Sequence, residues 1–251
     1  LGSLDNFYAR QHPSGFIARE MQEDGTEILW GGPQNAANPP IFAWAEWEYF
    51  RFSGDRSRLS RVALPLEKHL EWWAQKGSPE ALAHAPDWNA QGRRARDSVH
   101  TLFWNTPNGS GTQNLPREGT GWVDASSQMV LAWKSLAGIC DELGQHQKAA
   151  RFAREAQDLS AQINRWCWNE TDGFYYDVRR DGTQFKAQTV AGFWPLVAGV
   201  ATPKQAARLA AHLLNERKFW RPVPFPSLEA AHPQNRAIPA GAARCGRRRI
   251  T

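Results

Sequence analysis

A loop at residues 109–124 holds the polar side chains of this sequence with the clearest chemical potential. It reads GSGTQNLPREGTGWVD and contains Gln113, Asn114 and Arg117. Side-chain amides hydrogen-bond hydroxyl groups, and a guanidinium binds a carboxylate or a pair of hydroxyls through two parallel N–H bonds. Trp104 precedes the loop and Trp122 lies near its end, and aromatic faces pack against apolar C–H surfaces such as those of pyranose rings. The combination is compatible with a sugar-binding site.

Asp124, at the end of the loop, could donate a catalytic proton. It could equally be the N-cap of a helix that begins at Ala125, where a carboxylate accepts backbone N–H groups. We favour the cap, because such hydrogen bonds lower the pKa of a carboxyl group, whereas a general acid needs a raised pKa. Arg117 also has two interpretations, as a clamp for a substrate or as the partner of a neighbouring acidic side chain. Both stay open at this point.

Tryptophan is unusually frequent, with 13 residues in the chain. Trp30 and the two tryptophans of the 104–124 region lie in stretches without helical periodicity, where a ligand could reach them. Others follow apolar helical stripes and are expected in the core, namely Trp44, Trp47, Trp133, Trp166 and Trp194. Lys186, close to a predicted hairpin, is a further polar candidate for a sugar site.

Three pairs of segments predict helical hairpins, at residues 39–76, 125–168 and 187–215. In the first two pairs the leading segment is apolar around most of its circumference, which is typical of a buried helix. The following segment carries one apolar stripe at i, i+3/i+4 spacing, which is typical of an outer helix. The pattern therefore predicts inner and outer helices in alternation.

Two smaller elements complete the expected fold. A helix is predicted at Leu4–Gln11, and a β-hairpin where residues 174–176 and 183–185 flank a turn. The long connections at 12–38 and 77–124 are the expected places for function, because loops of that length are uncommon in compact domains. The predicted fold class is all-α with a small β-hairpin insertion.

Composition excludes several function classes. The net charge of +5 is concentrated in residues 217–251, which hold eight basic residues and one acidic residue, so the body of the chain gives no indication of nucleic-acid binding. No run approaches the ~20 apolar residues of a membrane-spanning helix. The three scattered cysteines and seven histidines form no metal-ligand motif. Neither metal nor other cofactor is expected.

Seven segments in order along the chain resemble the bacterial branch of a glycoside hydrolase group. This group includes mannosylglycerate hydrolases, family-63 α-glucosidases and, more distantly, trehalases. The resemblance runs from about residue 4 to residue 234. The segments are the loop 104–117, LDNFYARQHPSGFIARE (4–20), NPPIFAWAEWEYFRFSGD (38–55), WVDASSQ (122–128), CWNETDGFYYD (167–177), FWPLVAGVATP (193–203) and FWRPVPFPSL (219–228).

The resemblance implies an (α/α)6 toroid, with six inner helices inside six outer ones and the sugar bound among the loops at one end. It also implies an inverting reaction, in which a general acid and a general base lie roughly 6.5–9.5 Å apart. The acid of these enzymes is the Asp of a Gly-x-Gly-x-Asp-Asn-x-Pro-Arg loop, and here Gln113 stands at that position. An amide cannot donate a catalytic proton. The second carboxylate of the family lies beyond the segments that show the resemblance.

The resemblance therefore implies a piece of an inverting α-glycosidase, acting on α-linked glucosides or mannosides in an oligosaccharide or glycoside. Asn114 and Gln113 would bind sugar hydroxyls and Arg117 would orient them. Two alternatives stay open, a non-catalytic sugar-binding member of the same fold and a helical-hairpin interaction scaffold. The unequal lengths of the hairpins count against the scaffold, because repeat arrays keep a fixed period.

Residues 1–236 are expected to belong to one (α/α)6 catalytic domain, and residues 237–251 to form an unstructured or non-native basic tail. The predicted helices number about half of what a toroid needs, so the chain is expected to be a fragment that hydrolyses no glycoside by itself. We also expect self-association through uncovered apolar faces at 41–52 and 129–143. No signal indicates a compartment, and the cytoplasm is the default expectation.

Overall fold

Helical hairpins dominate the computed structural model, which describes residues 2–28, 38–74, 95–96, 100–104, 115–119, 121–233 and 235. The elements along the chain are α1 (Gly2–Ala9), β1 (Glu20–Met21), β2 (Glu27–Ile28), α2 (Phe42–Ser53), α3 (Arg56–Ala74), β3 (Ala95–Arg96), β4 (Phe103–Trp104), α6 (Val123–Glu142), α7 (His146–Trp166), β5 (Trp168–Asn169), β6 (Phe174–Tyr175), β7 (Asp177–Val178), β8 (Gln184–Phe185), the 3-10 helix η2 (Val190–Phe193), α8 (Trp194–Val197) and α9 (Pro203–Leu213).

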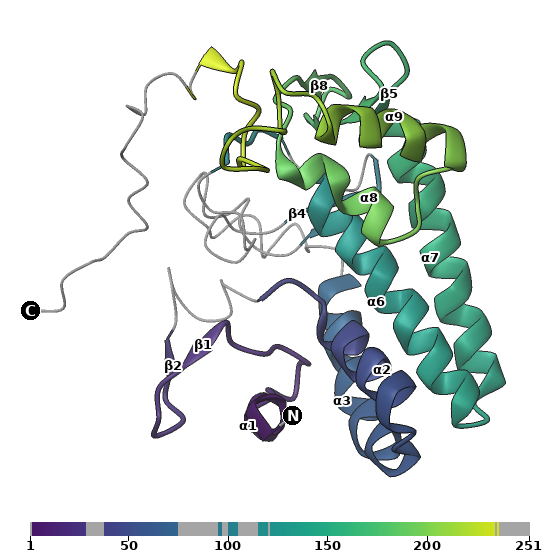
Figure 1. The fold of residues 1–251 in the computed structure, drawn as a ribbon. Helices are drawn as coiled ribbons and strands as arrows, with labels where there is room; N and C mark the ends of the chain where they lie inside the picture. Colours follow the sequence, from purple (N-terminus) through teal and green to yellow (C-terminus); the bar gives the residue numbers. More distant parts are fainter. Residues whose placement is uncertain are drawn as a thin grey trace, which may run out of the picture.

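The three predicted pairs of helices are confirmed. α2 and α3 form one antiparallel hairpin and α6 and α7 the next, and α8 and α9 follow at the upper end in Figure 1. α7 buries a single stripe of four residues, as an outer helix should, namely Phe152, Ala156, Leu159 and Ile163. The fold is all-α and corresponds to part of an (α/α)6 toroid. The prediction that α2 is the buried member of its pair is wrong, because α2 buries only Phe42, Ala43 and Glu46 whereas α3 buries nine residues.

α6 is the central helix of the described part. It packs against α2, α3, α7 and α8, and Met129, Val130 and Leu136 are completely buried. The expectation that the apolar face of 129–143 would be uncovered is therefore wrong, because neighbouring helices flank α6 on several sides. Within the other segment predicted to be uncovered, 41–52, Phe52 at the end of α2 is 93% exposed, whereas Phe42 and Ala43 are buried.

The β-hairpin prediction is correct in place but differs in pairing. β7 pairs with β8, whereas Phe174 and Tyr175 form β6 and pair with β5. The reason is a second turn at residues 169–173, where the Gly173 N–H donates to the carbonyl of Asn169 at 2.8 Å. Gly173 has a φ of 66°, a left-handed conformation that suits glycine. Two short hairpins therefore follow α7 in place of one.

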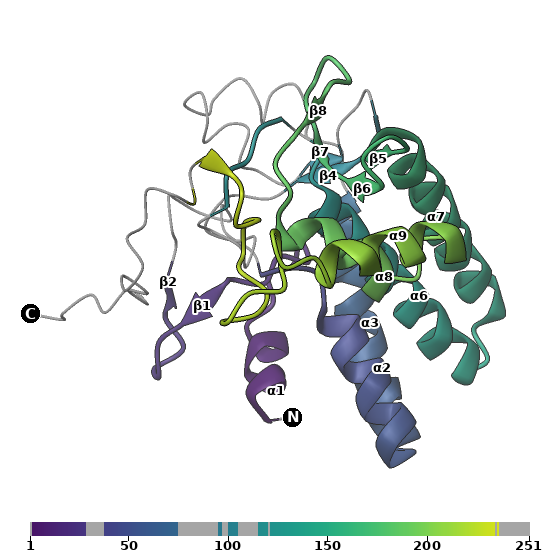
Figure 2. The ribbon, with the colours of Figure 1, turned by 45° about the horizontal axis from the view of Figure 1, so that its top comes forward.

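A small layer of extended segments covers the start of α6. Residues 121–122 lie between two strands, because the Trp122 N–H donates to the carbonyl of Phe103 at 2.9 Å and the Gly121 N–H donates to the carbonyl of Val178 at 3.0 Å. β4 and β7 are therefore joined through the segment that enters α6, and Figure 2 shows both strands at that end of the helix.

None of the described helices is long and apolar enough to cross a membrane. The predicted basic tail at 237–251 lies outside the described residues.

Candidate functional site

Arg117 and Asp124 form a buried ion pair at the end of the 109–124 loop. Arg117 Nη1 donates to Asp124 Oδ1 at 2.9 Å, and Nη2 donates to Oδ2, so the contact is bidentate. The side chain of Asp124 is 1% exposed. Of the two interpretations of Arg117, the pairing with a neighbouring acid is therefore the one that the contacts favour.

Asp177 adds a second carboxylate to this pair. Its Oδ2 accepts from Arg117 Nη1 at 3.1 Å, and its Oδ1 accepts from the backbone N–H of Val123 at 2.9 Å. The capping prediction for Asp124 needs correction here, because α6 begins at Val123, two residues before Ala125, and Trp122 is its N-cap residue without a side-chain hydrogen bond. Asp177, from a distant strand, accepts the N–H of Val123, the first in the helix. Asp124 still accepts a backbone N–H of the first turn, as predicted, because the Ala125 N–H donates to its Oδ1 at 2.8 Å.

The cluster holds one cation and two carboxylates in a buried place. Burial raises the pKa of Asp177 to about 6, and the carboxylate of Asp124 adds to that rise, although Arg117 opposes it. Burial alone would lower the pKa of Arg117, but Asp124 and Asp177 outweigh it and raise that pKa. The main cause of the raised pKa of Asp177 is therefore desolvation of its carboxylate, to which repulsion from Asp124 adds.

Trp122 lies directly against the cluster. The guanidinium carbon of Arg117 is 4.3 Å from the centre of the Trp122 ring, a cation–π distance. Trp122 Nε1 donates to the carbonyl of Gly119 at 3.1 Å. Trp122 and Trp104 are each 5% exposed, so both pack in the interior. Gln113, Asn114 and Trp30 lie outside the described residues.

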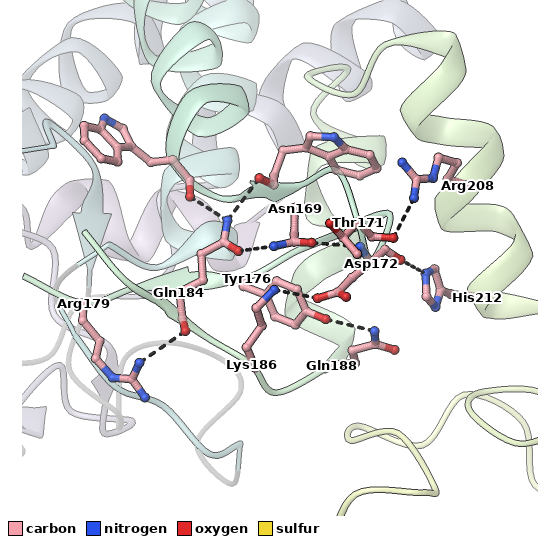
Figure 3. A network of polar contacts seen from close by, with 12 residues as sticks. Asn169, Thr171, Asp172, Tyr176, Arg179, Gln184, Lys186, Gln188, Arg208 and His212 are labelled. Carbon is pink, nitrogen blue, oxygen red and sulfur yellow. Dashed lines mark hydrogen bonds and ion pairs between the residues drawn. The ribbon is translucent and has the colours of Figure 1, made fainter. Parts of the chain in front are cut away.

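Lys186 belongs to a different polar network, shown in Figure 3. Its amino group donates to Asp172 Oδ2 at 2.6 Å and lies 4.6 Å from the centre of the Tyr176 ring. Tyr176 in turn accepts a hydrogen bond from Gln188 at 3.0 Å. The structure thus divides the predicted site residues that it describes between two places, with Arg117, Asp124 and Trp122 together and Lys186 on the second hairpin.

Asp177 is the residue of the cluster that sequence reasoning missed. It closes the segment CWNETDGFYYD, where it follows three consecutive aromatic residues, and its side chain is 9% exposed. An acidic residue that continues such a run is a usable signal, because a buried carboxylate needs a charged or hydrogen-bonding partner elsewhere in the fold. Among the described residues, no group of three or more His, Cys, Asp or Glu side chains is arranged to hold a metal ion.

Comparison with known proteins gives a family match across almost the whole chain. The family model for the mannosylglycerate hydrolase MGH1-like glycoside hydrolase domain matches residues 3–245. The chain belongs to this family. An uncharacterized protein of Borreliella burgdorferi is 25% identical over 232 residues, which are 92% of this chain and 45% of that protein. The chain thus spans less than half the length of this curated relative.

Solved structures agree on the fold. The GH63 mannosylglycerate hydrolase from Thermus thermophilus in complex with glucose matches with a TM-score of 0.61 at 16% identity, over 92% of this chain and 67% of that chain. The same enzyme in complex with Tris and D-glycerate gives a TM-score of 0.60 at 16% identity, over 92% and 68%. The sequence resemblance to mannosylglycerate hydrolases and the (α/α)6 architecture it implied are both confirmed.

Proposed function

We propose that this chain is the sugar-binding part of an inverting α-glycosidase that acts on α-linked mannosides or glucosides. The observation that carries the proposal is the family match over residues 3–245. The mannosylglycerate hydrolase of Thermus thermophilus, which has this fold, is known in complexes with glucose and with D-glycerate. Mannosides of glycerate are therefore the first substrates to test.

In this proposal the loop 104–124 forms the floor of the sugar site. Gln113 and Asn114 bind sugar hydroxyls, Trp30 supplies a stacking surface, and Lys186 borders the site from the hairpin after α7. Trp104 and Trp122 are both buried, so in this proposal they pack within the protein and do not contact the sugar. Arg117 acts from inside the protein, since its guanidinium is occupied by two carboxylates.

Asp124 is not the general acid in this proposal. Its carboxylate is 1% exposed and bound to Arg117 through both oxygens. A general acid must come within hydrogen-bond reach of the glycosidic oxygen, and this carboxylate faces a guanidinium instead. Position 113 keeps that role in the family motif, with glutamine in place of the acid.

A non-catalytic sugar-binding protein of the same fold is the second candidate. The observation in its favour is Gln113, because an amide at the general-acid position keeps hydrogen-bonding capacity but has no proton to transfer. Both candidates require that the chain bind a pyranoside. They differ in whether a carboxylate at position 113 brings about hydrolysis.

The test is a titration of the chain with methyl α-mannoside, methyl α-glucoside and mannosylglycerate, in which binding is measured by ligand-detected NMR. We expect saturable binding of at least one of them, and loss of that binding in Gln113→Ala and Asn114→Ala. The matched control is Gln157→Ala on α7, a glutamine outside the proposed site. Absence of binding for all three sugars would contradict both candidates.

A further inference from the structure

The segment that leads from Arg117 into α6 contacts β7 and the residue after it at two of its described positions, Gly121 and Glu118. The Val178 N–H donates to the carbonyl of Gly121 at 2.8 Å, and the Gly121 N–H donates to the carbonyl of Val178 at 3.0 Å. One residue further on, Arg179 Nε donates to Glu118 Oε2 at 2.6 Å. The segment therefore runs beside β7 as an additional antiparallel partner.

The approach of the two backbones is too close for a side chain at residue 119. A Cβ atom built on Gly119 would lie 2.3 Å from the carbonyl oxygen of Val178, and Gly119 has a φ of 84°. Both features call for glycine. At Gly121 an added Cβ would lie 2.7 Å from Leu102 Cδ1. The contact between segment and strand is thus a feature of backbone geometry as well as of side chains.

Asp177 of β7 makes two hydrogen-bonded contacts at the ends of this segment. One carboxylate oxygen accepts from Arg117 before the segment, and the other accepts from the backbone of Val123 after it. Because the two contacts lie on either side of residues 118–122, one carboxylate links Arg117 to the first residue of α6. A neutral or shorter side chain could make at most one of these contacts well.

Burying charged side chains costs desolvation free energy, which their attraction offsets only when the geometry is good. Well-packed apolar residues of similar volume often give equal or greater stability, so stability alone does not account for this cluster, whereas fixing a single geometry is a role that buried charges have in some proteins. Here that geometry belongs to the loop whose earlier part includes position 113, four residues before Arg117 in the sequence.

We propose that Asp177 is a positioning residue for the sugar-binding loop, acting through Arg117 and through the first N–H of α6. The proposal rests on the proposed function for the identity of the ligand, but the positioning itself is independent of it. Asp177 touches no substrate in this proposal, because its side chain is 9% exposed and both its oxygens are occupied by the protein. Its effect is to hold Arg117 and the first residue of α6 in one relative position.

The test combines amide hydrogen exchange with sugar binding in the 251-residue chain. Asp177→Ala removes both contacts, and we expect exchange at Gly121, Trp122 and Val123 to become about tenfold to a hundredfold faster, with unchanged exchange in the middle of α7. Asp177→Asn keeps an oxygen for the Val123 N–H but weakens the hold on Arg117. It should leave Val123 protected and still weaken sugar binding by about tenfold.

Two further variants make the result decisive. Asp181→Asn, on the exposed turn of the same hairpin, is the matched control and should change neither exchange at 121–123 nor sugar affinity. Gly119→Ala should reproduce the fast exchange of Asp177→Ala, because it forces the segment away from Val178 without touching a charge. Equal acceleration throughout the chain in Asp177→Ala, or unchanged sugar affinity despite a released segment, would overturn the proposal. If neither the parent chain nor any variant binds sugar, the proposed function fails while the exchange data still judge the positioning.

Discussion

Arg58 Nε donates to Glu46 Oε2 at 2.6 Å, and Arg58 Nη2 donates to Glu46 Oε1 at 2.7 Å, in the interior between α2 and α3. Glu46 is fully buried, and the side chain of Arg58 is 5% exposed. Tyr8 from α1 donates to Glu46 at 3.0 Å, and Arg58 also contacts Asp5 of α1. One buried ion pair therefore ties together the first three helices.

Removing one member of this pair should destabilise the chain strongly. Glu46→Ala leaves the Arg58 guanidinium buried without its main counter-charge, and we expect a loss of about 3–5 kcal/mol of unfolding free energy by urea denaturation. The matched control is Glu48→Ala, because Glu48 pairs with Arg51 at 3.1 Å on the same helix with side chains 47% and 61% exposed. That change should cost less than about 1 kcal/mol. Similar losses in the two variants would contradict the assignment of Glu46–Arg58 as a buried network.

The contrast between helices and loops explains what the sequence could predict. Apolar periodicity is a local property, and it predicted the hairpins at 39–76 and 125–168 correctly, although α2, apolar around most of its circumference, buries only Phe42, Ala43 and Glu46. The contacts of the charge cluster were not predictable in this way. Arg117 is 7 residues from Asp124 and 60 residues from Asp177 along the chain, and no spacing rule connects such positions.

The start of α6 illustrates the same limit. Asp124 accepts the N–H of Ala125, but α6 already begins at Val123, whose N–H is bound by Asp177. The β-hairpin shows it again, because the aromatic residues 174–175 can pair on either side, and the turn ending at Gly173 decides the partner. Long-range partners set the end-points of elements whose existence the local pattern predicts.

Asp177 should give the chain an unusual dependence of stability on pH. Its pKa is about 6 in the fold, against 3.8 as the reference value, so between these values the folded state binds more protons than the unfolded state. The unfolding free energy therefore decreases as pH rises from about 4 to about 6, and the stabilising effect of the bound proton is lost above that range. Between about pH 7.5 and pH 4, wild type should gain on the order of 1–3 kcal/mol relative to Asp177→Asn.

The control for this measurement is Asp181 on the exposed turn. Hydrogen bonds from Thr183 lower the pKa of Asp181, so its contribution to stability is present above the unfolded pKa and is lost as pH falls, the opposite sign to Asp177. The unfolding free energy of wild type relative to Asp181→Asn should therefore not increase as pH falls from about 7.5 to about 4. Equal pH profiles for wild type and Asp177→Asn would show that the pKa of Asp177 is the same in the folded and the unfolded state.

Restoring the acid at position 113 should separate the two candidate functions. The experiment uses a longer protein that joins this chain to the part of a relative that the chain does not cover. In that protein, Gln113→Asp should raise the rate of α-mannoside or α-glucoside hydrolysis by about 10²–10⁴-fold, the usual contribution of a general acid. NMR of the released sugar should show the inverted anomer first. Gln113→Asn tests whether a shorter polar side chain suffices, and it should give no gain. Equal rates for Gln113→Asp and the parent would favour the non-catalytic sugar-binding protein.

Gly192 is a position where a single methyl group should disturb the core. An added Cβ would lie 2.3 Å from Phe174 Cε1 and 2.7 Å from the carbonyl oxygen of Tyr175, so a ring and the backbone of β6 would both have to shift. We expect Gly192→Ala to cost about 1–3 kcal/mol of unfolding free energy. Gly2→Ala is the control, because no atom lies within 4 Å of its added Cβ and Gly2 is in α1. An unchanged melting temperature for Gly192→Ala would show that η2 can move away from β6.

An exposed apolar surface on the segment after α9 should control self-association of the chain. Three apolar side chains of this segment are exposed, Trp220 by 47%, Val223 by 83% and Phe225 by 49%. The ring centroids of Trp220 and Phe225 are 5.8 Å apart. Exposed apolar patches of this kind promote association. The triple variant Trp220→Ser, Val223→Ser and Phe225→Asn should sediment closer to a monomer at equal concentration, with an unchanged melting temperature, because exposed side chains contribute little to stability. Asparagine is chosen at residue 225 because its φ of 59° is left-handed, a conformation that asparagine tolerates.

Phe52→Ser is the comparison, since Phe52 is 93% exposed at the end of α2. A larger effect of this variant would place the contact on α2. If neither variant changes sedimentation, self-association through these apolar surfaces is contradicted.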